Sequence, residues 1–370
     1  MTPAELTTLN REVLWAAFAV AAGFGALVQR TGFCTMGAVS DAVAMGEWTR
    51  MRQWALAAAV ATLGFGVFAA TGVLTASQTL YASTRWLWLS ALAGGSVFGF
   101  GMVLSSGCIS KSLVRLGGGS LKSLVVLLVA GISAFATLRG LTAVWRVNTV
   151  DRVGLDFAGN ADLASVLARA GLGAAPAALL AALLVGGALL AFALSSREAR
   201  RPASLLAGAG VGALVLAMWW VTGHLGHLAE HPETLEETWL ATNSRRAEGL
   251  SFVSPTAYAL DWLMFFSDSS KRLTVGIVSV LGVIVGSAAV ALARRRFRWE
   301  GFAGTPDLGH HLAGGALMGV GGVTAVGCSI GQGVTGVSTL SLTSFVAAAA
   351  MVAGAVAGVR YQLWRLDREA

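Results

Sequence analysis

The strongest constraint on this chain is a series of apolar runs that are long enough to cross a lipid bilayer. A helix needs about 20 mostly apolar residues to span the hydrocarbon core. The chain has 370 residues, of which 55% are hydrophobic and only 12% are charged, so it has too little charge to cover a water-soluble protein of this size. We therefore predict an all-α polytopic membrane protein with about nine transmembrane helices, near residues 13–28, 54–75, 86–104, 121–140, 173–195, 203–222, 273–293, 310–326 and 340–359.

Two glycine-rich stretches repeat one another at an offset of 220 positions. Gly107 and Cys108 in the first stretch match Gly327 and Cys328 in the second, and seven of fifteen aligned positions are identical without a gap. The shared cysteine is informative because the chain has only three cysteines. A looser third copy of the motif ends at Cys34. These matches predict an internal repeat.

Lysines and arginines in the short connections predict the orientation of the chain, because such residues concentrate on the cytoplasmic side. Of the 26 basic residues, 16 lie in connections on the same side as the C-terminus. We therefore expect a cytoplasmic C-terminus and, with nine spans, an external N-terminus. The span before Cys108 then runs inward and the span before Cys328 runs outward, which predicts an inverted repeat. Its halves are residues 13–140 and 203–359, joined by a linking helix at 173–195 within one transporter domain, 1–370.

Short apolar segments predict broken or re-entrant helices between the spans. Residues 33–45 hold Cys34 and Asp41 but are too short to cross, and such segments are tolerated at membrane depth only where protein or a cavity satisfies their backbone. The offset of 220 maps Cys34 onto Ser254. We expect four short turns that enter the membrane, at Cys34, Cys108, Ser254 and Cys328, and an ion pair between Asp41 and Arg30.

The two long polar stretches, residues 141–172 and 223–272, are expected to form external caps with amphipathic helices. His224, His227 and His231 would share one face of such a helix, as positions i, i+3 and i+7 do. A solvated or interfacial face is the plainer interpretation, and we expect no metal site. The cysteines form no CxxC pair, which argues against zinc and thioredoxin-like chemistry. No nucleotide-binding or other cofactor motif occurs, and the net charge of +7 indicates topology instead of nucleic-acid binding.

The turns are suited to anions, because a helix that begins at a glycine-rich turn presents free N–H groups and the positive end of its dipole. Thiols add weak donors, and they could pass a soft sulfur-bearing anion by hydrogen bonds or by a covalent persulfide relay; both remain open. Lys111 and Arg115 would either offset anionic charge at the inner mouth or anchor the helix at the interface. The predicted binding residues are Cys34, Ser106, Gly107, Cys108, Ser110, Ser254, Gly327, Cys328, Ser329 and Gln332.

Three motifs carry a resemblance to a known family. GFGMVLSSGCISKSLVRLGGG, GGVTAVGCSIGQGVTGVSTLS and QRTGFCTMGAVSD together resemble the YeeE/YedE family of bacterial sulfur-transport membrane proteins, over about residues 23–358. The resemblance implies a protein of the bacterial inner membrane that imports thiosulfate past Cys34, Cys108 and Cys328, with Cys108 at the narrowest point. It also implies a TusA-like sulfurtransferase at the cytoplasmic side, which we expect to be a separate protein.

The residues and the resemblance together predict an importer of a sulfur-containing oxyanion, and not an enzyme. Thiosulfate is the expected substrate, and another sulfur or selenium compound that uses the same path is the alternative. A membrane thiol-redox enzyme is a hypothesis of a different class, against which the missing CxxC pair counts. A soft-metal permease is a further alternative, and it would require the three histidines to matter as much as the cysteines.

Overall fold

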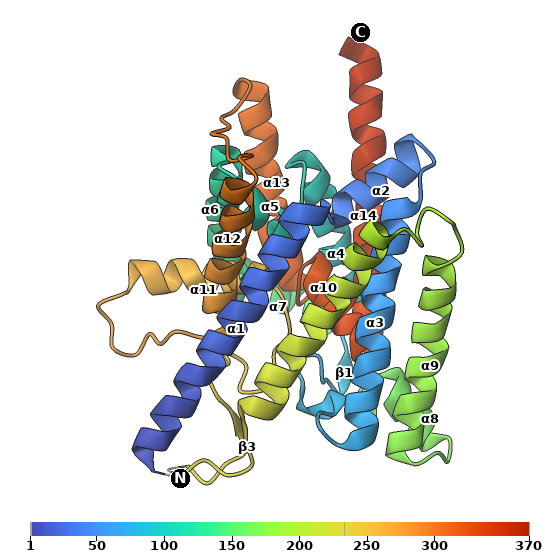
Figure 1. Ribbon diagram of the computed structural model, residues 1–370, viewed down its shortest axis with the longest axis vertical. Coiled ribbons are helices and arrows are strands. Elements are labelled where there is room, and N and C mark those ends of the chain that lie inside the picture. The colour runs from blue at the N-terminus through green and yellow to red at the C-terminus, as the bar shows by residue number, and fades with distance from the viewer. Residues whose placement is uncertain (1, 233, 370) are drawn as a thin grey trace.

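The computed structural model describes residues 2–232 and 234–369 and is built almost entirely of helices (Figure 1). The all-α polytopic prediction is confirmed. The two termini lie at opposite ends of the long axis. Nine helices of 17 or more residues form the bundle among the described residues: α1 (Pro3–Thr31), α3 (Thr49–Thr71), α4 (Trp88–Leu104), α6 (Leu121–Arg139), α9 (Ala174–Ala193), α10 (Pro202–Trp220), α12 (Val275–Ala293), α13 (Thr305–Thr324) and α14 (Leu342–Glu369).

These helices correspond to the nine predicted spans, with one qualification. Eight segments of the described chain are long and apolar enough to cross a membrane. Helix α13 is the long helix outside that set, because its first two turns carry Asp307, His310 and His311.

Short helices interrupt the bundle at the predicted places. Helix α2 (Thr35–Ala44) follows α1, α5 (Ile109–Gly117) follows α4, and α11 (Val253–Met264) precedes α12. A wide turn of helix, η4 (Gly331–Gly336), follows α13. Helices α2, α5 and α11 have 10, 9 and 12 residues, so none of them could cross a bilayer alone.

The first predicted cap, residues 141–172, is helical over more than half of its length, whereas the second, residues 223–272, contains little helix apart from α11. The remaining elements are η1 (Ala76–Gln78), β1 (Arg85–Trp86), α7 (Leu141–Asn148), η2 (Val150–Arg152), β2 (Leu155–Asp156), α8 (Leu163–Arg169), η3 (Val221–Leu225), β3 (His227–Leu228) and β4 (Thr238–Trp239). Strands β1 and β2 pair antiparallel, as do β3 and β4.

The prediction that three histidines share a helical face is wrong. The helical chain ends at Leu225, and His227 lies in strand β3. His227 Nε2 lies 2.8 Å from Glu237 Oε1, and the ring of His224 stacks on Trp220 with centroids 5.7 Å apart. No group of three potential metal ligands occurs among residues 2–232 and 234–369.

The packing of the long helices is paired in a way that matches the predicted repeat. Helix α1 packs on α12 and α10 packs on α3; likewise α14 packs on α4 and α6 packs on α13. The 220-residue offset relates α3, α4 and α6 to α12, α13 and α14, and the order of the spans in each half relates α1 to α10. Exchanging each helix for its counterpart turns each contact into its partner contact. The inverted repeat remains a prediction, and these paired contacts support it.

Helices α4 and α13 cross in the centre of the molecule and run antiparallel. A Cβ built on Gly94 would lie 2.5 Å from the backbone nitrogen of Ala325, and one on Gly101 would lie 2.9 Å from the carbonyl oxygen of Gly314. The start of α4 therefore contacts the end of α13, and the end of α4 contacts the start of α13. Small residues allow such close approach of two backbones in membrane proteins.

Replacing Gly94 by alanine should destabilise the protein, because the new methyl group would collide with backbone that cannot rotate away. Overpacking of this kind costs about 1–3 kcal/mol, more than the gain of about 1 kcal/mol in helix propensity. Gly187→Ala in α9 is the matched control, since a Cβ there meets nothing within 4 Å. Thermal unfolding of the detergent-solubilised variants should show a lower midpoint for Gly94→Ala only. Equal midpoints would contradict the close crossing.

Candidate functional site

Each of the three cysteines stands at the beginning of a short helical segment. Cys34 is the N-cap of α2 and its Sγ accepts the N–H of Gly37 at 3.4 Å. Cys328 Sγ accepts the N–H of Gly331 at 3.3 Å. Cys108 is the N-cap of α5, and its Sγ lies 3.1 Å from the Ser110 hydroxyl. The thiols therefore lie among the unpaired N–H groups that every helix start presents.

The turns before Cys108 and Cys328 have the same backbone structure. Ser106 and Val326 both adopt left-handed conformations, with φ of 56° and 59°. The next N–H in each turn bonds back across the helix end, from Gly107 to Met102 at 2.8 Å and from Gly327 to Gly322 at 2.7 Å. This is the helix-ending pattern that usually has glycine at the left-handed position. A β-branched residue such as Val326 is unusual there and is conformationally strained.

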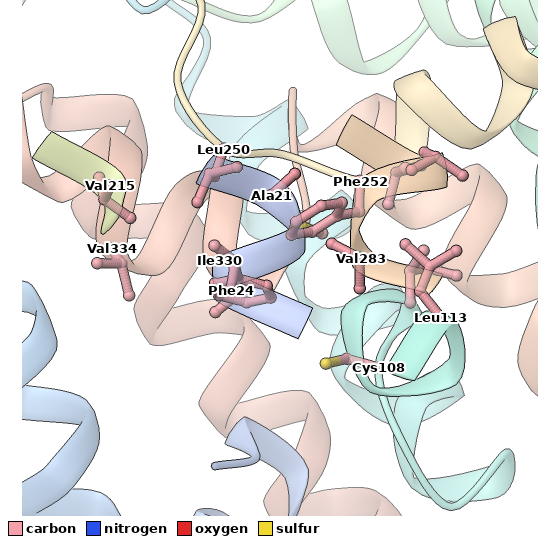
Figure 2. Packing of buried hydrophobic residues seen from close by; sticks show 14 of the residues in the cluster. Ala21, Phe24, Cys108, Leu113, Val215, Leu250, Phe252, Val283, Ile330 and Val334 are labelled. Atoms are coloured by element: carbon pink, nitrogen blue, oxygen red, sulfur yellow. The ribbon is translucent and has the colours of Figure 1, made fainter. Parts of the chain in front are cut away.

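Cys108 interacts electrostatically with both of the other cysteines, Cys34 and Cys328. Cys108 and Cys328 are buried, at 2% and 0% exposure, whereas Cys34 is partly exposed. Figure 2 shows the Cys108 sulfur pointing away from Leu113, toward the side where Phe24 and Ile330 lie. The three thiols thus form a series whose middle member is enclosed by apolar side chains.

Several buried polar atoms near the cysteines have no hydrogen-bond partner among the residues that the structure describes. They include Ser329 Oγ and Gln332 Oε1, although Gln332 Nε2 donates to the Ala325 carbonyl at 2.6 Å. Thr35 Oγ1 and Ser344 Oγ share this property. An unpaired buried polar group is costly and calls for an explanation. These atoms leave unused hydrogen-bonding capacity close to the cysteines.

Ser329 and Gln332 were predicted as site residues, whereas Thr35 and Ser344 were not. Thr35 follows Cys34 directly, so its position in the sequence could have indicated it as a site residue. Ser344 corresponds to Leu124 at the 220-residue offset, so the repeat gave no indication of it.

Cationic side chains gather at the Cys34 end of the series. A Cβ on Gly107 would lie 3.3 Å from Lys111 Cγ and 3.6 Å from Arg115 Nη1, so both side chains fold back over the Cys108 turn. Lys111 interacts electrostatically with Cys34, Cys108 and Arg50. Both side chains therefore lie beside the Cys108 turn, and their role, offsetting anionic charge or anchoring the helix at the interface, stays a prediction.

Arg50 is a third cation here, and sequence reasoning missed it. Its Nη1 would lie 2.7 Å from a Cβ on Gly37, and its Nε lies 3.3 Å from Asp41 Oδ2. The expected pairing of Asp41 with Arg30 is therefore wrong. Arg30 ends α1, whereas Arg50 starts α3 on the far side of the short helix that holds Asp41, and helix α3 packs directly on α2.

Two cavities adjoin the Cys328 turn. One, of about 200 Å³, is lined by Ser254 together with Glu248, Tyr258 and Val326. The other, of about 250 Å³, is lined by Gln332, Tyr81 and Val326. Val326, the strained residue of the turn, and Leu80 line both cavities. The structure places Ser254 in the first of them, two residues after Phe252, whose backbone N–H hydrogen-bonds the Cys328 thiol.

The remaining predicted residues shape the turns. Ser110 contacts the Cys108 sulfur, and Gly327 packs on Gln332, whose Cγ would lie 3.1 Å from a Cβ at that glycine. Ser106 occupies the left-handed position of its turn and is partly exposed.

Comparisons with known proteins agree on one kind of protein. A family model described as "Sulphur transport" matches residues 30–357. The thiosulfate transporter TsuA of Escherichia coli strain K12 is 29% identical over 339 residues, which cover 89% of each chain. The thiosulfate transporter TsuA of Spirochaeta thermophila is 24% identical over 354 residues, covering 92% of this chain and 97% of the relative. The probable transporter YedE of E. coli is 30% identical over 112 residues, which are 30% of this chain and 26% of YedE.

The difference in exposure predicts an order of thiol reactivity. A maleimide should modify Cys34 first and Cys108 and Cys328 at least about tenfold more slowly, because modification requires access and thiolate character. Intact-mass spectrometry of the folded protein over time would show one early adduct. That adduct should be absent from a Cys34→Ser variant, and an early adduct on Cys108 or Cys328 would contradict the burial described above.

Proposed function

The chain belongs to the sulphur transport family, and from that premise we propose that it imports a sulfur-containing oxyanion, most specifically thiosulfate, along the path marked by its three thiols. Its relatives are named transporters over nearly the full chain length, so the protein is a sulfur-compound transporter and not an enzyme. Its apolar helices make it a multi-pass membrane protein. The substrate and the path are the proposed parts.

The observation that carries the proposal is the series of three thiols at helix starts. A doubly charged oxyanion that leaves water needs hydrogen-bond donors throughout its passage. The helix starts at Cys34, Cys108 and Cys328 supply free N–H groups, and the thiols add weak S–H donors. Weak donors at several sites favour conduction, because a substrate that is held too tightly cannot leave.

We propose that the anion passes by hydrogen bonding and keeps its S–S bond. A covalent relay would transfer a sulfur atom to a thiolate and release sulfite, and the chain would then need a second step to remake thiosulfate or a carrier to take the sulfur. Hydrogen-bonded passage requires neither. The Ser329 hydroxyl, which has no partner among the described residues, supports it, because it could donate to either end of an asymmetric anion.

We propose that the end of the path with Arg50, Lys111 and Arg115 faces the cytoplasm and that the N-terminus is external. The charge distribution of the connections supports this orientation. Cations there would attract an anion that has passed Cys108 toward the cytoplasmic mouth. A separate TusA-like sulfurtransferase is the partner that we propose for the delivered sulfur, and the bacterial inner membrane is the location.

The first test is thiosulfate uptake by a bacterium that lacks its own sulfur importers. The intact chain should restore growth on thiosulfate as sole sulfur source, and Cys108→Ala should reduce initial uptake by about one to two orders of magnitude. Losing a hydrogen bond to a charged group costs about 1.5–3 kcal/mol, and Cys108 lies where the path is most enclosed. Membrane levels of both proteins must match. Uptake by Cys108→Ala at the wild-type rate would refute the proposed path.

A second test ranks residues by their position. Ser254→Ala should reduce uptake less than Cys108→Ala, because Ser254 lines a cavity beside the Cys328 turn, whereas Cys108 is buried at the middle of the proposed path. His231→Ala is the control and should leave uptake unchanged, since it lies in the external segment between β3 and β4. Radiolabelled thiosulfate uptake in matched membranes gives the ranking. A loss in His231→Ala as large as that in Cys108→Ala would favour the soft-metal alternative.

A further inference from the structure

The cavity that contains Ser254 holds a carboxylic acid that the proposed path does not yet use. Glu248 lies in the loop before α11 and lines this cavity of about 200 Å³. Its Oε1 accepts two backbone N–H groups, from Asn243 at 2.9 Å and from Ser244 at 2.7 Å. No hydrogen bond to Oε2 occurs within the part of the chain that the structure describes. One oxygen is therefore fixed by the loop, and the other is available.

No cation neutralises Glu248 in residues 2–232 and 234–369. Arg146, which lines the same cavity from α7, is paired with Asp151 at 3.5 Å. The guanidinium of Arg246 donates to the Ala82 carbonyl at 3.1 Å. Lys271 is paired with Asp261, farther along α11.

The other titratable groups that face Glu248 are two tyrosines. Tyr81, in the loop between α3 and α4, and Tyr258 on α11 both interact electrostatically with Glu248. Helix α12 contributes Ser279 and Gly276 to the cavity, and neither titrates. Burial raises the pKa of Glu248, and the hydrogen bonds from Ser244 and Asn243 oppose that change only in part.

An ionised Glu248 would be incompatible with an anion in the same small cavity. Two like charges a few ångströms apart repel strongly where little water screens them. A protonated carboxyl group reverses the interaction, because its O–H donates a hydrogen bond to the anion. The fixed Oε1 leaves Oε2 as the atom that would carry the proton.

We propose that Glu248 belongs to an outer binding subsite that accepts the oxyanion only when the Glu248 carboxyl group is protonated, with Oε2–H as the donor. This inference rests on the proposed function and adds a binding residue to it. The proton comes from the outer solution, stays on Glu248 while the anion is bound, and no covalent bond changes. Binding of the anion and binding of the proton are thus linked at one cavity.

The linkage between proton and anion binding predicts that a rise in pH weakens anion binding. Below the pKa of Glu248 the subsite is already protonated and the apparent KM should be constant. Above that pKa each anion must bind together with a proton, so the apparent KM should rise as pH rises, approaching tenfold per pH unit. The maximal rate should change much less, because a saturating anion concentration restores the protonated, occupied state.

Glu248→Gln is the decisive variant, because its amide can keep the Oε1 contacts to Asn243 and Ser244 while its NH₂ group replaces the protonated oxygen as a permanent donor. Thiosulfate uptake between pH 5.5 and 8.5 should give a KM that is constant within about twofold for this variant. Glu236→Gln, an exposed acid of the same external region, is the matched control and should keep the wild-type pH slope. Unchanged thermal midpoints would verify the fold of both variants.

A binding measurement supplies a second readout that does not depend on transport. Calorimetric titration of the purified protein with thiosulfate, in buffers of different ionisation enthalpy, reports the protons taken up per anion. The wild type should take up close to one proton at the alkaline end, and Glu248→Gln should take up none. A pH slope in Glu248→Gln equal to that of the wild type, or wild-type binding without proton uptake at all pH values, would overturn the inference alone. Absence of thiosulfate binding and uptake by the wild type at every pH would overturn the proposed function and this inference with it.

Discussion

The antiparallel crossing of α4 and α13 is the contact on which the site depends. Each helix ends in the turn that leads to a cysteine, so the position of both turns follows from how closely the two backbones approach. Ala325 packs against Gly94, and Ser105 packs against Gly314. Eleven residues of helix separate Gly94 from Ser105, which sets the two turns about 16 Å apart along α4 at 1.5 Å per residue. Bulkier side chains in this crossing would separate the helices and displace both turns together.

Burial in a membrane would allow the proposed path to bind an anion without a large charge in its centre. Backbone groups in a lipid environment must find partners within the protein, yet the first N–H groups of a helix have none inside that helix. The short helices bring such groups to the interior, where the cysteine sulfurs accept two of them. An anion would be a stronger acceptor than a thiol sulfur. The same donors that stabilise the resting structure could therefore serve a substrate, and the exchange would be nearly balanced.

The sequence predicted the helices well because bilayer thickness imposes a length and a composition on each span. It also located the turns at Cys108 and Cys328, since the repeated glycines and cysteines reflect one shared backbone structure.

Contacts between side chains that lie on different elements were harder to predict. Arg50 reaches Asp41 across the short helix α2, whereas Arg30 was expected as the partner only because it is close in the chain. The histidine prediction failed because i, i+3 and i+7 spacing has meaning only within a helix, and η3 ends at Leu225. The sequence contained no indication of Glu248, because this residue becomes a candidate binding residue only through the cavity that α7, α11 and α12 form around it.

Two turns of the same backbone structure would let the side chains give the proposed path a polarity that the backbone lacks. At the 220-residue offset Lys111 corresponds to Gly331 and Arg115 corresponds to Thr335, so the cations that follow Cys108 in its own short helix have uncharged counterparts after Cys328. The Cys328 turn is flanked instead by the cavity with Glu248, whose charge depends on pH. An anion would thus move from a cavity in which Arg146 is paired with Asp151 and Glu248 can ionise to a turn covered by Lys111 and Arg115. Equivalent backbones supply the donors along the whole path, and the unequal charges at its two ends would determine where the anion is admitted and where it is released.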